Sequence, residues 1–307
     1  SRLFRVTAPT GPAHRTAPHR TAPHRTAPHR EGFMHRIDLD LSATAAVLLD
    51  VDGTIAGSDH RISARTSAAM RALDEAGVPV VLATGRTRSQ VLDIARDAGL
   101  RSPQISCNGG LITDPLTAQD LWVRPVPDAD MTAMVELHHV TGQPLTWWTI
   151  DQVFATSQPL ARAMEEINEA TVVLATPEDI EPGTVLKTMI FGTRQELDDA
   201  APAVGRLVPR AMRSMNEFWE LSAPDASKWS AIEYVFDRLG VDPARAAGAG
   251  DGGNDAIWLA RIGAPVAMGN ARPEARAVAA AVIGRHDEDG AAEFLEEVLR
   301  QVGTRVG

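Results

Sequence analysis

Short runs of apolar or small residues alternate with amphipathic stretches along most of the chain. The runs that predict buried strands are 45–49, 78–83, 244–249, 265–268 and 280–283. The stretches with a helical period are 63–76, 89–98, 229–239, 254–261 and 291–302. Gly77, Gly99 and Gly240 follow three of these stretches and predict where the helices end. Strands that alternate with helices in this way are typical of an α/β domain with a parallel sheet.

The pattern changes between about residues 114 and 221. Trp147 and Trp148 lie in a stretch of alternating polarity, and 171–175 and 185–191 are further β runs with helical patterns between them. This texture predicts an α+β domain inserted into the α/β core. We therefore expect the core to consist of 34–113 and 222–307, with the inserted domain at 114–221.

The first 33 residues form a separate, low-complexity segment. From Thr16 to Arg30 the chain repeats TAPHR three times, with a looser copy before it. A proline in every unit and the lack of an apolar period predict an extended, disordered tail. The recurring histidines suggest a metal-binding or anion-binding arm, but a repeat without a fold does not fix the geometry that such a site needs. We expect a dispensable tail, or an extension upstream of a true start at Met34.

Charge and cysteine content exclude several classes of protein. The chain has 30 basic and 40 acidic residues, of which six basic and one acidic lie in the first 33, so the remainder has 24 and 39 and a net charge of -15. Such an acidic body argues against binding to nucleic acid or anionic lipid. No apolar stretch reaches the length of a membrane span. The single cysteine, Cys107, predicts a cytoplasmic protein without an internal disulfide.

Three polar clusters directly follow predicted strands. They are DVDGT at 50–54, TGR at 84–86 and GDGGND at 250–255. Because the carboxyl ends of parallel strands share one edge of a sheet, we expect the three clusters to converge. Carboxylates, a hydroxyl group and glycines with free N–H groups suit a hard divalent cation and a phosphate.

Lysine is rare in this chain, which uses arginine for almost every other cation. Only Lys187 and Lys228 occur among the 30 basic residues. Lys228 directly precedes the predicted helix that re-enters the core. A compact ammonium is a better point charge for a crowded phosphate than a planar guanidinium, so Lys228 is a candidate ligand of phosphate.

Together these motifs resemble those of haloacid dehalogenase-superfamily phosphatases, and more narrowly of their Cof-type branch. The resemblance rests on DVDGT at 50–54, ATGR at 83–86, Ser227-Lys228 and GDGGND at 250–255, in that order and with the insertion after the second motif. It extends over about residues 37–299. It implies a Rossmann-like parallel-sheet core with a large inserted α+β cap that selects the substrate.

The resemblance also implies roles for individual residues. Asp50 would be the nucleophile that forms an aspartyl-phosphate, and Asp52 the general acid and base, with the nearby Asp50 carboxylate favouring its protonated form. Asp50, the backbone carbonyl of Asp52 and Asp251 would bind Mg²⁺. Asp255 would support Lys228 or the metal shell, and Arg86 would either contact substrate or hold its loop. The phosphate-binding residues would be Val51, Thr84, Gly85, Lys228 and Asn254.

The implied activity is a magnesium-dependent phosphatase for a small phosphorylated metabolite, with sugar phosphates as the expected class. A phosphomutase or a dedicated disaccharide-phosphate phosphatase on the same scaffold is one alternative, and a non-catalytic phosphate-binding module is another. The sequence leaves the oligomeric state open. The family usually has glycine after the motif lysine, where this chain has Trp229.

Several conspicuous residues have a structural explanation that we favour. Cys107 is expected in a strand, as a small core residue rather than a nucleophile. Trp147, Trp148 and Trp219 are expected to pack the core of the inserted domain more than to line a pocket. Lys187 is expected to reach water from a strand of the inserted domain.

Overall fold

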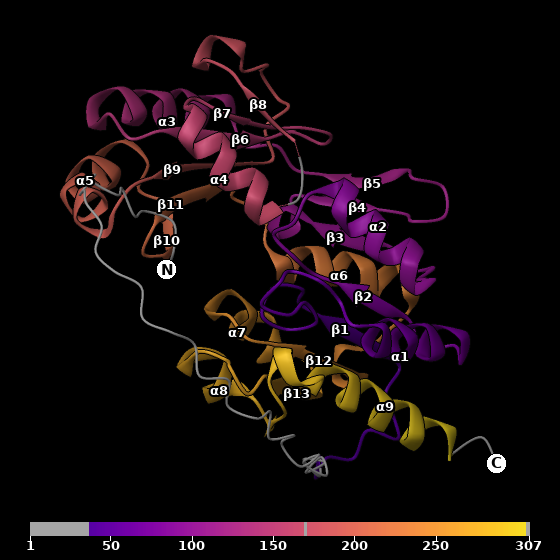
Figure 1. The fold of residues 1–307 in the computed structure, drawn as a ribbon. Helices are drawn as coiled ribbons and strands as arrows, with labels where there is room; N and C mark the ends of the chain where they lie inside the picture. Colours follow the sequence, from indigo (N-terminus) through magenta and orange to yellow (C-terminus); the bar gives the residue numbers. More distant parts are fainter. Residues whose placement is uncertain (1–36, 169–170, 305–307) are drawn as a thin grey trace, which may run out of the picture. The chain divides into compact units, whose positions relative to one another are not determined.

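The computed structural model describes residues 37–168 and 171–304, so the predicted tail at 1–33 lies outside the described residues. Its core sheet has five parallel strands in the order β14-β13-β12-β1-β2, with β1 next to the edge strand β2 (Figure 1). Every residue of β1, β2 and β12 is buried, as expected for a parallel sheet covered on both faces. The strands are β1 (Ala46–Leu49), β2 (Val80–Leu82), β12 (Ala246–Gly250), β13 (Ala264–Ala267) and β14 (Ala281–Val282).

Three core helices begin or end at capping residues that the sequence signals. Ser63 caps α1 by accepting a hydrogen bond from the Thr66 N–H, and Ser227 caps α6 in the same way. Gly99 and Gly240 end α2 and α6 in the left-handed conformation. The helices are α1 (Ala64–Glu75), α2 (Arg88–Ala98), α6 (Lys228–Leu239), α7 (Gly253–Leu259), α8 (Pro273–Val278) and α9 (Gly290–Gly303).

A small antiparallel sheet extends the core beyond β2. It consists of β3 (Gln104–Ser106), β4 (Leu111–Thr113) and β5 (Asp120–Val123). A parallel bridge between Ala83 and Ile105 joins β3 to the end of β2. The β4–β5 pairing crosses residue 114, where the sequence predicts the core to give way to the inserted domain.

The inserted segment forms the cap, which is built on a six-stranded sheet in the order β10-β11-β9-β6-β7-β8. All its strand pairs are antiparallel except β7 with β8. Its strands are β6 (Leu145–Trp148), β7 (Val153–Ala155), β8 (Val172–Leu174), β9 (Lys187–Phe191), β10 (Met212–Met215) and β11 (Phe218–Ser222). Its helices are α3 (Asp128–Thr141), α4 (Gln158–Asn168) and α5 (Arg194–Leu207).

The two adjacent tryptophans of β6 pack on opposite faces of the cap sheet. Trp147 joins an apolar cluster with residues of α3 and α5 and stacks on Phe154, with ring centroids 5.2 Å apart. Trp148 joins a second cluster with residues of α4. Both are only 1% exposed, and Trp219 is half-buried with its Nε1 donating to the Leu197 carbonyl. Because successive side chains of a strand point to opposite faces, each face of the cap sheet packs one of the two tryptophans in its apolar cluster.

Cys107 is buried as expected, but the prediction that it lies in a strand is wrong. The strand β3 ends at Ser106, and Cys107 and Asn108 both adopt left-handed conformations, with φ of 50° and 56°. This turn lets the Cys107 N–H donate to the Arg86 carbonyl and the Asn108 N–H donate to the Thr84 carbonyl, each at 2.9 Å. These two hydrogen bonds join the turn to the loop that follows β2, which a continued strand would not do.

The next residue, Gly109, allows this turn to approach the start of α6. Gly109 has a φ of 95°, and a Cβ placed on it would lie 2.1 Å from the Ser227 carbonyl oxygen. No side chain fits at that distance, so the glycine is required both by its dihedral angle and by its contact. Gly109 thereby allows the turn to pack directly against the residue that precedes Lys228.

We predict that Gly109→Ala lowers the free energy of unfolding by at least about 1 kcal/mol more than Gly183→Ala does. Gly183 also has a positive φ, of 71°, but a Cβ placed on it would have no atom within 4 Å. The pair therefore separates the steric clash from the cost of the dihedral angle. Denaturant unfolding followed by tryptophan fluorescence gives both values, and equal losses would contradict the proposed role of the contact.

Cys107 is predicted to be unreactive in the folded protein. Burial raises the pKa of its thiol to about 11, and the thiolate is the reactive species. Ellman's reagent at pH 8 should therefore give no stoichiometric release from the native chain and one equivalent after unfolding in guanidinium. Rapid reaction of the native protein would show that the thiol is accessible.

Candidate active site

The three polar clusters predicted from the sequence do meet at the carboxyl edge of the core sheet. Asp50 directly follows β1, and its N–H donates to the Ala249 carbonyl of β12 at 3.1 Å. Thr84 follows Ala83, the residue after β2, whose N–H donates to the Leu49 carbonyl at the end of β1. Asp251 directly follows β12. Because β1 lies between β2 and β12 and all three strands are parallel, their polar ends face a single region.

Lys228 lies between two carboxylates at this edge. Its Nζ is 2.6 Å from Asp50 Oδ1 and 2.7 Å from Asp255 Oδ1, and all three side chains are at least nine-tenths buried. Burial opposes the charge of Lys228, but the neighbouring Asp255 and Asp50 outweigh burial and raise the pKa of the ammonium. Lys228, the first residue of α6, thus links the residue that follows β1 to α7.

Asp255 uses both of its oxygens to hold this arrangement. Oδ1 also accepts a hydrogen bond from Trp258 Nε1 at 3.0 Å, and Oδ2 accepts from the N–H groups of Asp251 and Gly252 at 3.2 and 2.9 Å. A carboxylate with this many donors is fixed in orientation. Of the two supporting roles implied by the resemblance, the contacts of Asp255 match the support of Lys228.

The carboxylates of Asp50, Asp251 and Asp255 form a crowded acidic cluster. One oxygen from each lies within 4.8 Å of the others. Burial, together with the charge of Asp255, raises the pKa of Asp50 to about 8 against the opposing effect of Lys228. Burial and Asp255 likewise raise the pKa of Asp251 to about 6. Both shifts have the same cause, because burial and the neighbouring Asp255 carboxylate make a negative charge on Asp50 or Asp251 unfavourable without a cation.

This donor set fits a hard divalent cation. Carboxylate oxygens are the ligands that Mg²⁺ prefers, and a cation would offset the repulsion among the carboxylates. Since Asp255 is already saturated by N–H donors, Asp50 and Asp251 are the carboxylates left to hold the ion. Gly53 permits this geometry, because with its φ of 79° a Cβ would lie 2.5 Å from Asp251 Oδ2.

The Asp52 carboxylate contacts Arg86 and His60, whereas the sequence indicates only the influence of the nearby Asp50. Arg86 donates from Nη2 to Asp52 Oδ1 at 2.8 Å and from Nε to Oδ2 at 3.1 Å, and His60 Nδ1 lies 3.6 Å from Oδ1. Partial burial raises the pKa of Asp52, but the hydrogen bonds and charge of Arg86, with those of His60, outweigh burial and lower it. The expectation that its surroundings favour the protonated form is therefore wrong for this conformation.

Arg86 and His60 thus belong to the surroundings of the site. Arg86 also donates to the His60 carbonyl at 3.1 Å, so it holds the loop after β1 as well as Asp52. His60 itself has a positive φ of 63°. The sequence motifs single out Arg86 without fixing its role, and they miss His60, whose only signal is its nearness in the chain to the DVDGT motif.

The remaining predicted phosphate ligands differ in how far their side chains are exposed. Thr84 is fully buried, and Asn254 is exposed on the first turn of α7. The Val51 side chain is buried, and its carbonyl accepts from the N–H groups of the tight turn at 54–56. Trp229 packs on the core cluster with Arg261 5.3 Å above its ring, so it faces the core.

Lys187 is buried rather than exposed to water, which corrects the expectation from its strand. It is 6% exposed, and its Nζ lies 3.4 Å from the Gly85 carbonyl oxygen. The second lysine of the chain is therefore also next to a predicted phosphate-binding loop.

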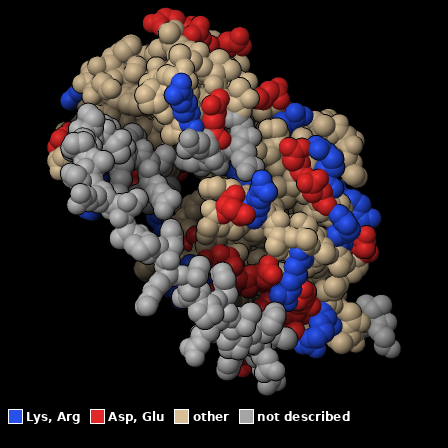
Figure 2. Space-filling view, viewed as in Figure 1, with Lys and Arg blue, Asp and Glu red and all other residues tan. Residues whose placement is uncertain are grey.

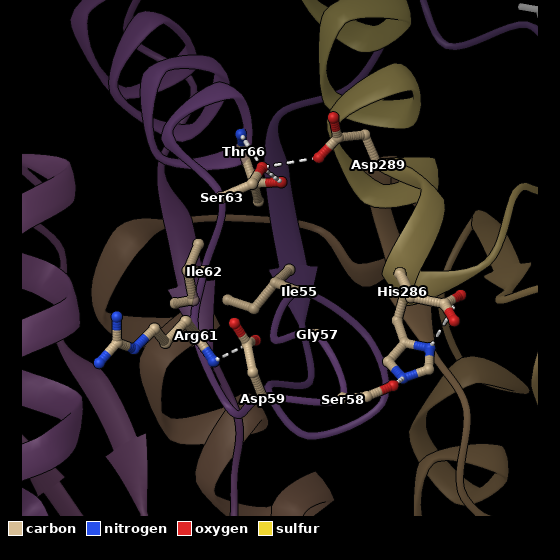
Figure 3. A pocket seen from close by; sticks show the side chains of 11 residues that line it. Ile55, Gly57, Ser58, Asp59, Arg61, Ile62, Ser63, Thr66, His286 and Asp289 are labelled. Carbon is tan, nitrogen blue, oxygen red and sulfur yellow. Dashed lines mark hydrogen bonds and ion pairs between the residues drawn. The ribbon is translucent and has the colours of Figure 1, made fainter. Parts of the chain in front are cut away.

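A separate pocket lies beside the loop that connects β1 to α1 (Figure 3). Several of its polar side chains have hydrogen-bond partners within the pocket wall: Ser58 with His286 Nε2 at 3.3 Å, Asp59 with the backbone N–H of Arg61, and Ser63 with Asp289. The wall of the pocket is also tied to the DVDGT turn, because Asn270 donates to the Gly53 carbonyl and accepts from the His286 N–H. These contacts hold the turn in place.

Comparisons with known proteins agree with this architecture. A model of the haloacid dehalogenase-like hydrolase family matches residues 47–295. The chain is 28% identical over 259 residues to a phosphoglycolate phosphatase of Methanopyrus kandleri, covering 84% of this chain and 99% of that protein. It is 26% identical over 287 residues to phosphatase YwpJ of Bacillus subtilis, covering 82% and 99%.

Solved structures show the same fold. A haloacid dehalogenase-like hydrolase from Bacteroides thetaiotaomicron superposes with a TM-score of 0.76 at 23% identity, covering 83% of this chain and 99% of that one. A subclass IIB sugar phosphatase of the same superfamily superposes with a TM-score of 0.72 at 23% identity, covering 83% and 98%. The resemblance inferred from the motifs is confirmed, and the protein belongs to the haloacid dehalogenase-like hydrolase family.

Proposed function

We propose that the protein is a magnesium-dependent phosphatase that hydrolyses a small phosphorylated metabolite, with sugar phosphates as the substrate class. The observation that carries the proposal is the buried Lys228 ammonium between Asp50 and Asp255, with Asp251 beside them. In this proposal the arrangement would provide a nucleophile, a fixed cation and a pair of metal-binding carboxylates at one sheet edge. It matches the demands of phosphoryl transfer, in which positioning and electrostatics supply most of the catalysis.

Asp50 is the proposed nucleophile. Its carboxylate attacks phosphorus, the bond from phosphorus to the ester oxygen breaks, and an aspartyl-phosphate forms. Lys228 holds one Asp50 oxygen at 2.6 Å, which leaves the other oxygen for attack. The ammonium also offsets the negative charge that gathers on the phosphoryl oxygens.

Asp52 is the proposed acid and base. Its proton passes to the leaving oxygen in the first step, and the carboxylate then accepts a proton from the water that hydrolyses the aspartyl-phosphate. Because the ion pair with Arg86 lowers the pKa of Asp52, acid catalysis requires the side chain to leave Arg86 and turn toward the substrate. Its side chain is half exposed, so it has room to rotate.

Asp50, Asp251 and the backbone carbonyl of Asp52 would hold Mg²⁺. When bound, the cation supplies charge neutralisation for the phosphoryl group. Thr84, the Gly85 N–H and Asn254 are proposed to bind the remaining phosphoryl oxygens, with Val51 contributing from the nucleophile loop. The names of the relatives from Methanopyrus kandleri and Bacillus subtilis support phosphatase activity for this chain as well.

The charge distribution supports a small-molecule substrate. On the part of the described chain visible in Figure 2, Lys and Arg are scattered among Asp and Glu, and acidic side chains gather in the central hollow. A nucleic-acid partner would need a continuous basic patch.

No helix among the described residues combines the length and the apolar character of a membrane span. A cytoplasmic location stays a prediction that rests on the single cysteine.

The activity is tested by phosphate release from p-nitrophenyl phosphate and a panel of sugar and nucleotide phosphates. With Mg²⁺ the full chain should turn over one or more of them, and EDTA should abolish the release because the acidic cluster is then left without its cation. Conversion of a sugar phosphate to its isomer without phosphate release would favour the mutase alternative. Binding of phosphate esters by a folded protein that releases no phosphate would favour a non-catalytic module.

Asp50→Asn should lower phosphate release by at least about 10³-fold, because the amide cannot form the acyl-phosphate. The matched control is Asp97→Asn, since Asp97 is an exposed carboxylate near the end of α2. It should keep wild-type turnover. Circular dichroism checks that both variants fold. An Asp50→Asn protein with near-normal turnover would remove Asp50 from the role of nucleophile.

A further inference from the structure

Lys187 is the first residue of β9, a central strand of the cap sheet. It pairs with Trp148 at the end of β6 and with Ser222 at the end of β11 (Figure 1). Its neighbour Leu186 packs in an apolar cluster with Cys107 and Leu111 of the core. The side chain is thus held at the base of the cap and only 6% exposed.

The ammonium of Lys187 has a specific but incomplete set of partners. Its Nζ lies 4.5 Å from the centre of the Trp148 ring, a cation–π distance, and 3.4 Å from the Gly85 carbonyl oxygen, a long hydrogen bond. An ammonium has three N–H donors. Among residues 37–168 and 171–304, no carboxylate lies within ion-pair distance of Lys187.

The two lysines of the chain therefore differ in whether a carboxylate neutralises them. Lys228 is neutralised by two carboxylates, whereas Lys187 is equally buried and has none among the described residues. A buried cation without a counter-charge is costly, because it has lost water without gaining an anion. Such a group is suited to an anion that arrives from outside the chain.

The position of Lys187 indicates which anion it serves. Its contact is the carbonyl of Gly85, in the loop that follows β2, and β2 pairs with β1, which ends just before Asp50. Lys228 and the acidic cluster belong to the core, whereas Lys187 reaches this loop from the cap strand β9. Lys187 therefore contacts the loop that is proposed to hold the phosphoryl group, and an anion carried by a substrate bound there is its candidate partner.

We propose that Lys187 is a specificity-determining residue that binds a second anionic group, a carboxylate or a second phosphate, on the leaving group of the substrate. This inference rests on the proposed phosphatase function and narrows it. Small phosphate esters with a second anionic group are the substrate class, and sugar phosphates of this kind, such as phosphorylated sugar acids, are preferred over neutral ones.

Two phosphonates that differ only in charge test the proposal without requiring turnover. In 3-phosphonopropionate a carboxylate takes the place of the terminal methyl group of propylphosphonate, and neither carbon–phosphorus bond is a hydrolysable ester. Calorimetric titration of the full chain in Mg²⁺ should show at least about tenfold tighter binding of 3-phosphonopropionate, as expected for one charge-assisted hydrogen bond. In Lys187→Met, which keeps the apolar stem, the ratio of the two dissociation constants should fall to about one.

Two further variants serve as controls. Lys187→Arg keeps the charge and should restore part of the ratio. Arg162→Met removes an exposed cation from α4 of the cap and should keep the wild-type ratio. If Lys187→Met does not fold, Lys187→Gln takes its place, and the wild-type ratio is in any case a test of its own.

The outcomes separate this inference from the proposed function. A wild-type ratio near one, a ratio that survives loss of Lys187, or no binding of either phosphonate overturns the role of Lys187. Phosphate release from p-nitrophenyl phosphate is measured on the same protein. Release without an anion preference leaves the phosphatase and removes this inference, whereas an anion preference lost in Lys187→Met without any release supports the anion site and overturns the phosphatase.

Discussion

The buried ammonium of Lys228 is the interaction on which the site depends, because it joins three segments that are far apart in the sequence. Lys228 is 178 residues from Asp50 and 27 from Asp255. Removing the ammonium would leave two buried carboxylates facing one another, with Asp251 close by, which is more costly than the loss of one hydrogen bond. The capping serine before it, the glycine contact at residue 109 and the N–H donors around Asp255 all fix where this charge lies.

Much of the fold could be predicted from the sequence because its local signals agree with the tertiary structure. The apolar runs became the parallel strands, and the serine and glycine signals marked the ends of α1, α2 and α6. The convergence of the polar clusters followed from one rule about parallel sheets. The family was identifiable because four motifs occur in a fixed order, and the family model that spans 47–295 confirms it.

The predictions that failed concern contacts that no local pattern encodes. Cys107 follows a run that predicts a strand, but its backbone turns in order to bond to the loop that follows β2. The motif places Asp52 two residues from Asp50, whereas Arg86, 34 residues later, lowers the pKa of Asp52 against the opposing effect of burial. The strand pattern predicts that Lys187 reaches water, but Lys187 is buried. The pattern could not show this, because the burial comes from packing of the base of the cap against the core.

The order of the core strands has a consequence for how this chain is made. β1 pairs with β12, Ala46 opposite Ala246, so its partner leaves the ribosome 200 residues later. At roughly 5–20 residues per second this takes about 10–40 s. During that interval the apolar β1 has β2 on one side and an open edge on the other, while the whole cap is synthesised between them. The nascent chain therefore lacks the partner of one β1 edge throughout the synthesis of its own cap, and an unpaired strand edge of this kind favours aggregation.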